Sequence, residues 1–234
     1  MRVVTVQAVV RDHDSSRRPA LRRQSQSLGA QPRGGPALLG VARRWADTMT
    51  SPVALIIGAG DATGGAIARR FAREGYVACV TRRSLEKLQP LLDRIKADGG
   101  QAHGYASDAR KEEEVIALGE LIESTLGPIE VLVFNIGANA PSSVLEETAR
   151  KYFKIWEMAC FGGFLNGREV AKRMVTRAGA GRQQTIIFTG ATASIRGSAN
   201  FSAFAGAKHA LRALAQSMAR ELAPPKHSRC TCRR

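Results

Sequence analysis

The chain lacks the long apolar run that a membrane-spanning helix requires. No stretch of its 234 residues approaches the roughly 20 consecutive apolar residues needed to cross a bilayer. Cysteine and histidine are also scarce, with four of each, and aromatic residues make up only 6% of the chain. The cysteines do not have the spacing of metal ligands; they are Cys79, Cys160, Cys230 and Cys232. We therefore expect no membrane association, no metal site and a reducing compartment.

Acidic residues are too few to balance the basic ones, and the net charge is +15. This excess lies mainly at the ends, because residues 1–48 carry +6 and residues 224–234 carry +4, whereas residues 49–223 carry only +5. The middle of the chain has no Arg/Lys stripe interleaved with aromatic residues. We therefore expect no specific nucleic-acid partner. A nucleic-acid interaction driven by the basic ends is kept as an alternative hypothesis.

The two ends have the composition of segments outside a folded core. Residues 11–36 are rich in Arg, Ser, Gln, Gly and Pro, so residues 1–48 are predicted to be a disordered Arg-rich extension of a cytoplasmic protein. There are two alternatives: residues 1–48 are a mitochondrial transit peptide, or natural translation starts at Met49 and these residues do not belong to the protein. Residues 224–234 are predicted to be an irregular basic tail, since Pro224-Pro225 ends the preceding helix.

Between these ends, short apolar runs alternate with helical spacing. The pattern predicts strands at 53–57, 77–81, 101–106, 131–135 and 184–189. It predicts helices at 64–73, 84–97, 111–125, 149–178 and 203–222. Ser84 is the expected N-cap of the second helix, and a bend is expected at Gly162-Gly163 in the fourth. Such alternation is typical of a Rossmann-type doubly wound parallel sheet in a three-layer α/β/α domain, here residues 49–223. No strand follows Leu222. We therefore expect a truncated sequence, and a sheet that is incomplete at its C-terminal edge and exposed there unless a partner covers it.

The first of these strands runs directly into a glycine-rich turn. Residues 57–64 read Ile-Gly-Ala-Gly-Asp-Ala-Thr-Gly, and helical spacing begins immediately afterwards. A strand, glycine turn and helix expose backbone N–H groups at a helix N-terminus, where a phosphate binds. The turn therefore predicts a nucleotide site at the carboxyl edge of the sheet.

The order and spacing of these pieces resemble the short-chain dehydrogenase/reductase family over residues 52–223. The family's Thr-Gly-x-x-x-Gly-x-Gly motif is matched by Gly58 and Gly64, while Ile57 replaces its Thr and Ala62 its middle Gly. The segment at 134–137 resembles the family's Asn-Asn-Ala-Gly through Asn135 and Gly137. The resemblance implies a bound nicotinamide dinucleotide and, by position, cofactor contacts from Gly58, Gly60, Asp61, Gly64, Arg82, Arg83, Asp108, Asn135, Gly137 and Lys208.

Two of these positions bear on which dinucleotide is bound. Arg82 and Arg83 follow the second strand, where an NAD site usually has an acid, and two guanidinium groups suit the 2′-phosphate of NADP. We therefore expect NADP in preference to NAD. Asp108 matches the family's Asp beside the adenine, and it would equally serve as the N-cap of the following helix.

The catalytic positions depart from the family's pattern. In its Tyr-x-x-x-Lys motif Lys208 is kept but Phe204 replaces the Tyr, Ala191 stands at the Ser position, and Ala159 falls near the Asn position. The remaining catalytic candidates are Lys208, with a water that it holds, and Ser194; nearby Ser and Thr residues are read more simply as caps and turns. His209 is about 100° around the helix from Lys208 and is expected to point elsewhere.

These observations lead to two main hypotheses. The first is an NADP(H)-dependent oxidoreductase of the short-chain dehydrogenase/reductase type, which acts on an unidentified carbonyl or alcohol with non-standard catalytic residues. The alternative is a catalytically inactive dinucleotide-binding or interaction protein. The resemblance also implies a homo-oligomer, formed through the helices at 149–178 and 203–222.

Overall fold

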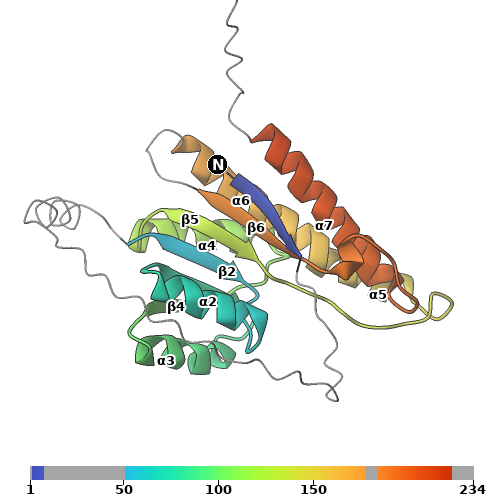
Figure 1. Cartoon of the computed structure of the whole chain (residues 1–234), viewed down its shortest axis with the longest axis horizontal. Coiled ribbons are helices and arrows are strands. Elements are labelled where there is room, and N and C mark those ends of the chain that lie inside the picture. The colour runs from blue at the N-terminus through green and yellow to red at the C-terminus, as the bar shows by residue number, and fades with distance from the viewer. Residues whose placement is uncertain (1, 8–50, 178–183, 223–234) are drawn as a thin grey trace, which may run out of the picture. The chain divides into compact units, whose positions relative to one another are not determined.

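The computed structural model describes residues 2–7, 51–177 and 184–222, and these contain a parallel six-stranded sheet with helices on both faces (Figure 1). The strand order is β1-β6-β5-β2-β3-β4. The strands are β1 (Arg2–Gln7), β2 (Val53–Ile57), β3 (Val77–Arg82), β4 (Gln101–Ala106), β5 (Ile129–Phe134) and β6 (Thr185–Gly190). The helices are α2 (Thr63–Arg73), α3 (Gln89–Ala97), α4 (Glu112–Thr125), α5 (Ala149–Trp156), α6 (Gly162–Thr176) and α7 (Ser202–Glu221), with short turns η1 (Glu86–Leu88), η2 (Glu157–Phe161) and η3 (Thr192–Ser194).

The prediction of a doubly wound parallel sheet is confirmed. The central strands β2 and β5 are buried along their whole length, because helices cover both of their faces. Alternate residues of β2 enter two separate cores. Leu55 packs with residues of α4, α6 and α7, whereas Ile56 packs with residues of α2 and α3.

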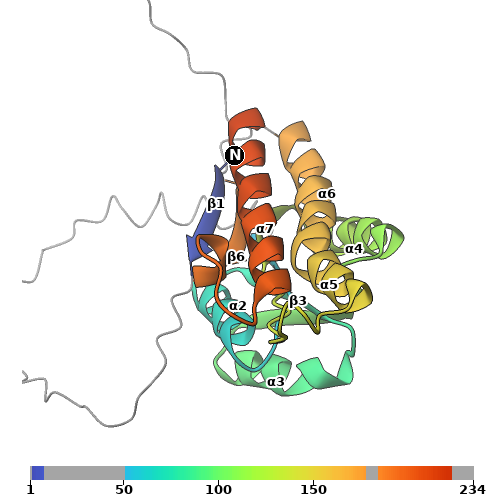
Figure 2. The ribbon, with the colours of Figure 1, turned by 90° about the vertical axis from the view of Figure 1, so that its right-hand side faces the viewer.

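The N-terminal strand β1 corrects two expectations. It pairs with β6 in parallel, from Arg2 opposite Thr185 to Gln7 opposite Gly190, and it lies beside α7 (Figure 2). Residues 2–7 are therefore not part of a disordered extension, and β6 is not the exposed edge of the sheet. The run Val3-Val4-Thr5-Val6 is rich in the β-branched residues typical of strands, but its pairing partner β6 lies far along the chain. The predictions for residues 8–48 and 224–234, including the transit peptide, Cys230 and Cys232, fall outside the described residues.

Strand β6 is covered less evenly than β2 and β5. Ile186 and Phe188 are buried toward α6 and α7, whereas the alternate residues Thr185, Ile187 and Thr189 are only half-buried. Helices α2 and α3 pack on the opposite face against β2, β3 and β4. Among the described elements, the layer on that face therefore stops short of β6.

Two predicted helix starts and the continuity of one predicted helix need correction. The helix expected from Ser84 begins as α3 at Gln89, because Pro90 is tolerated only in the first turn of a helix. Helix α4 begins at Glu112 with Lys111 as its N-cap residue, so Asp108 does not cap it. The long helix predicted for 149–178 contains the π-helical turn η2, which lies just before the expected bend at Gly162.

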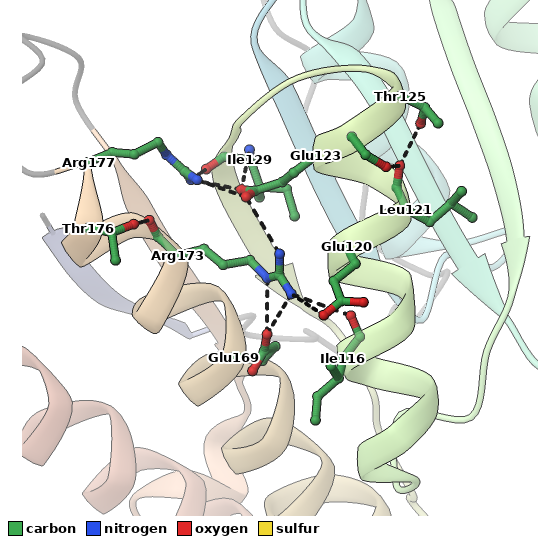
Figure 3. A network of polar contacts seen from close by, with 11 residues as sticks. Ile116, Glu120, Leu121, Glu123, Thr125, Ile129, Glu169, Arg173, Thr176 and Arg177 are labelled. Atoms are coloured by element: carbon green, nitrogen blue, oxygen red, sulfur yellow. Dashed lines mark hydrogen bonds and ion pairs between the residues drawn. The ribbon is translucent and has the colours of Figure 1, made fainter.

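A network of ion pairs fastens α4 to α6 (Figure 3). The Arg173 guanidinium on α6 donates to Glu169 Oε1 through Nε at 3.0 Å and through Nη2 at 2.8 Å, and its Nη1 lies 3.7 Å from Glu123 Oε2 on α4. Arg177 pairs with the same Glu123 at 2.8 Å. The guanidinium lies over Gly119, where an added Cβ would come within 2.9 Å of Arg173 Nε. Glycine at 119 therefore leaves room for this bridge.

Candidate cofactor and active site

The glycine turn after β2 requires glycine at two positions for different reasons. Gly58 has a φ of +83°, in the left-handed region that side chains with a Cβ rarely adopt. Gly64 is needed for close approach, since a Cβ there would lie 2.5 Å from the Gly58 carbonyl oxygen. Asn135 fixes the turn from β5, as its Nδ2 donates to that oxygen at 3.2 Å. The turn therefore closes tightly at the N-terminus of α2.

Two adjoining pockets open over this turn at the carboxyl edge of the sheet. One has a volume of about 310 Å³ and the other of about 330 Å³. They share Gly58, Gly60, Asn135 and Gly137, so together they form one groove. The first is called here the adenosine-side pocket, after the part of a dinucleotide that the family resemblance predicts there. It is also lined by Ile57, Ala59, Thr81, Arg82, Arg83, Ser107, Asp108, Ala109, Arg110, Ile136 and Met158. The second, called here the lysine pocket, is also lined by Asp61, Ala62, Thr63, Gly64, Thr189, Gly190, Ala191, Phe204 and Lys208.

The adenosine-side pocket is rich in guanidinium groups. Arg82 is half-buried and its Nη1 donates to the Lys87 carbonyl at 3.3 Å, while Arg83 is exposed. Asp108 is the one carboxylate among the described residues that line this pocket, and it pairs with Arg110 at 2.6 Å. Hydrogen bonds from Arg110 lower the pKa of Asp108 to about 2. The pocket therefore has a net positive charge, which suits an anionic ligand.

Lys208 is the one basic side chain among the described residues that line the lysine pocket. Its side chain crosses from α7 to the strand ends, and its Nζ donates to the carbonyls of Thr189 at 2.9 Å and Ile136 at 3.1 Å. The residue is only 3% exposed, and this burial lowers its pKa to about 8. The Phe204 ring and Ala191 line the same pocket without any group that exchanges a proton.

The structure brings together all of the predicted site residues except Ser194. Ser194 is fully buried, and its Oγ accepts a hydrogen bond from the Ala191 N–H at 3.0 Å. Its hydroxyl therefore stabilises the turn η3 and does not line either pocket, which corrects its nomination as a catalytic residue. Ala159 is also fully buried. His209 is exposed and its Nδ1 donates to the Ala205 carbonyl at 2.9 Å, so it points away from Lys208, as expected.

Two residues that line the adenosine-side pocket were missed in the sequence. Arg110 holds Asp108, two residues earlier, and also donates to Glu157, which is 47 residues away in sequence. Met158 comes from η2. Nothing in the spacing around 110 or 158 indicates a site, because their positions depend on how η2 packs beside the start of α4.

Two kinds of feature are absent from the described residues. No cluster of three or more His, Cys, Asp or Glu side chains in this part of the chain is placed to hold a metal ion. None of the described helices is both long and apolar enough to cross a membrane.

Comparison with known proteins gives a consistent family assignment. The family model for short chain dehydrogenase matches residues 52–228. A short-chain dehydrogenase/reductase of Armillaria gallica is 32% identical over 174 residues, which are 74% of this chain and 66% of that protein. Sorbitol-6-phosphate 2-dehydrogenase of Escherichia coli is 28% identical over 73% of this chain and 66% of its own length. The chain thus spans about two thirds of the length of these relatives.

Solved structures share the fold at similar coverage. A short-chain dehydrogenase from Rhodopseudomonas palustris is 48% identical with a TM-score of 0.67, over 74% of this chain and 79% of that one. An actinorhodin polyketide ketoreductase variant solved with NADPH is 28% identical (TM-score 0.69; 74% of this chain, 65% of that one). An NAD⁺-bound xylitol dehydrogenase is 27% identical (TM-score 0.70; 76% of this chain, 67% of that one). With the glycine turn, the parallel sheet and the family model in agreement, this chain belongs to the short-chain dehydrogenase/reductase family of oxidoreductases.

Proposed function

We propose that this chain is an NADP(H)-dependent oxidoreductase that interconverts a small carbonyl compound and its alcohol. The observation that carries the proposal is the single groove along the carboxyl edge of the sheet. At one end it has Arg82 and Arg83, in its middle the glycine turn, and at the other end Lys208. A dinucleotide laid along this groove would place its phosphates on the backbone N–H groups of the turn.

The residues of the groove fit this cofactor. Nothing lies within 4 Å of the Cβ that Gly60 or Gly137 would carry, so the floor of the groove is open to a ligand. In this proposal Arg82 and Arg83 bind the 2′-phosphate, Asp108 lies beside the adenine, and Lys208 binds the nicotinamide ribose. Asp61 and Gly64 border the pyrophosphate at the start of α2. The cofactor supplies or accepts a hydride at its nicotinamide ring.

Lys208 would organise the proton that accompanies the hydride. Of its three N–H donors, two already go to backbone carbonyls. To bind the ribose and also hold a water in the lysine pocket, Lys208 would exchange one of these two bonds for the ribose hydroxyl when the cofactor binds. In reduction, the carbonyl carbon would gain the hydride and its oxygen would take a proton from that water; the hydroxide left beside the Lys208 ammonium would then take a proton from solvent. Phe204 and Ala191 leave room for this water without competing for the proton.

Cofactor binding is tested by titrating the full chain with NADPH and with NADH, using nicotinamide fluorescence. We expect saturable binding of both, with the lower dissociation constant for NADPH. Turnover is then screened with carbonyl substrates of different sizes. Absence of nucleotide binding at millimolar concentration would refute the proposal, and tighter binding of NADH would refute its cofactor preference.

A non-catalytic dinucleotide-binding or interaction protein remains the second candidate. It is favoured by the lysine pocket itself, in which Phe204 and Ala191 provide no acid or base. The two candidates predict the same cofactor titration. They differ in turnover, and the substitutions at these two positions described in the Discussion separate them.

We also infer a cytoplasmic location, in which the buried free thiols of Cys79 and Cys160 would stay reduced.

We further infer that the chain forms a homo-oligomer through the surface of α5 and α6. Phe153, Trp156, Phe161 and Phe164 form a row of stacked rings with centroids 6.1–6.2 Å apart, and Phe153 is 61% exposed. The π-helical turn η2 aligns Trp156 with Phe161, five residues later. Light scattering of a Phe153→Lys variant tests this surface; an unchanged oligomer mass would contradict it.

A further inference from the structure

Arg110 holds the carboxylate of Asp108 in the adenosine-side pocket. Its Nε donates to Asp108 Oδ1 at 2.8 Å, and its Nη2 donates to Oδ2 at 2.6 Å. The Arg110 backbone N–H also donates to Oδ1, at 3.2 Å. Both side chains are only 15% exposed, so this bidentate ion pair is largely shielded from solvent.

A second carboxylate anchors Arg110 from the other side. Glu157 on η2 accepts from Arg110 Nη1 at 3.0 Å, and Lys154 pairs with the same Glu157 oxygen at 3.1 Å. Each of the three guanidinium nitrogens of Arg110 therefore has a carboxylate partner. This arginine is held as a counter-ion and is not free to bind a phosphate itself.

The pairing affects the neighbouring arginine. Asp108 and Arg83 line the same pocket and are close enough for the charge of Arg83 to contribute to the lowered pKa of Asp108. Within the described part of the chain, Arg83 has no hydrogen bond or ion pair to another side chain, so its guanidinium faces solvent. Without Arg110, the Asp108 carboxylate would draw Arg83 to itself and would repel a phosphate dianion placed beside it.

We propose that Arg110 is a positioning residue for cofactor selectivity, which neutralises Asp108 and so leaves Arg82 and Arg83 available to the 2′-phosphate of NADP(H). The inference rests on the proposed function, because it concerns the same cofactor groove. NADPH and NADH share the adenine, the riboses, the pyrophosphate and the nicotinamide. Only the 2′-phosphate distinguishes them, so a role in selectivity changes the ratio of their dissociation constants, whereas loss of structure weakens both together.

The test measures that ratio by fluorescence titration of the full chain at low salt. Arg110→Met should lower the preference for NADPH by about tenfold, which corresponds to about 1.4 kcal/mol. In the double variant Arg110→Met/Asp108→Asn the Asp108 charge is removed and Glu157 keeps Lys154 as its partner, so the ratio should return to within about threefold of wild type. Arg110→Lys keeps the charge but loses the bidentate geometry, so its NADPH/NADH ratio should lie between those of Arg110→Met and wild type. If Arg110→Met does not fold, Arg110→Lys replaces it.

Arg173→Met is the matched control. Arg173 also grips a carboxylate through Nε and Nη2, that of Glu169, but on α6 and away from the groove. Its loss should leave the NADPH/NADH ratio unchanged. The inference is overturned if wild type prefers NADPH and Arg110→Met retains the wild-type ratio, or if the double variant fails to restore it. A wild-type chain that binds neither dinucleotide would instead refute the proposed function, and one that prefers NADH would refute its cofactor preference.

Discussion

The ammonium nitrogen of Lys208 lies 5.9 Å from the ring centre of Phe204, one turn earlier on α7. The two residues line the same pocket, so an oxygen attached to this ring would share that pocket with a buried cation. A nearby cation lowers the pKa of a phenol, which is what a proton donor at this position requires. The arrangement around Lys208 is therefore suited to an acid that the chain itself does not carry.

Restoring that acid should increase turnover. We expect Phe204→Tyr combined with Ala191→Ser to raise kcat for a carbonyl substrate by about a hundredfold, because a positioned general acid contributes at least that much. Steady-state kinetics with NADPH measure the change. Phe164→Tyr on α6, outside both pockets, is the control and should have no effect. If wild type already matches the double variant, the non-catalytic hypothesis fails; if neither turns over any substrate, the oxidoreductase hypothesis is weakened.

The buried amine of Lys208 should make stability depend on alkaline pH. Burial lowers its pKa in the folded chain from 10.5 to about 8, so the unfolded chain binds more protons between these values. The cost of the buried charge is present below pH 8 and is relieved as the pH rises toward 10.5. Urea unfolding should show wild type gaining up to about 3 kcal/mol across this window relative to Lys208→Met. Lys172→Met, at an exposed lysine of α6, should follow wild type.

The same titration should appear in the reaction. If the charge of Lys208 holds the water that donates the proton, kcat/KM for carbonyl reduction should fall above pH about 8. Lys208→Arg keeps its charge at these pH values, so any activity it retains should lack this alkaline limb. An unchanged pH profile in Lys208→Arg would assign the limb to another group.

The bridge between α4 and α6 should contribute to stability. Arg173→Met leaves the Glu169 and Glu123 carboxylates without this partner, although they are only 10% and 17% exposed. We expect the free energy of unfolding to fall by about 2 kcal/mol, measured by urea denaturation. Arg70→Met is the comparison, because its pair with Glu74 is largely exposed and should contribute less than about 0.5 kcal/mol. Equal losses in the two variants would contradict a special role for the bridge.

Pairing of β1 with β6 can be tested with two neighbouring prolines. The Arg2 N–H donates to the Gln184 carbonyl, and N–H groups alternate in direction along a strand, so that of Val4 also points toward β6 and that of Thr5 points away. Val4→Pro should therefore remove a ladder hydrogen bond and lower the melting temperature by several degrees, whereas Thr5→Pro should have a clearly smaller effect. Equal melting temperatures in both variants would argue against β1 as part of the sheet.

Much of the fold could be predicted because its signals are local. The predicted bounds of β2 and β4 are the same as those in the structure, because each strand is a short run between clear turn residues. The glycine turn was found in the same way, and Asn135 was found through its family position. By contrast, Ser84 was read as a helix N-cap from its local pattern, and Pro90 prevents the helix from extending that far back.

The sequence by itself determined the alternation of strands and helices, the glycine turn and the presence of Phe204 four residues before Lys208, because each depends on residues close together in the chain. Only the tertiary structure decided that β1 pairs with β6, that Ser194 is buried and that Arg110 pairs with Glu157, 47 residues away in the chain. The physical reason is the same in all three cases. Strand pairing, burial and ion pairing depend on which distant segments meet, and hydrophobic periodicity along the chain carries no record of those meetings.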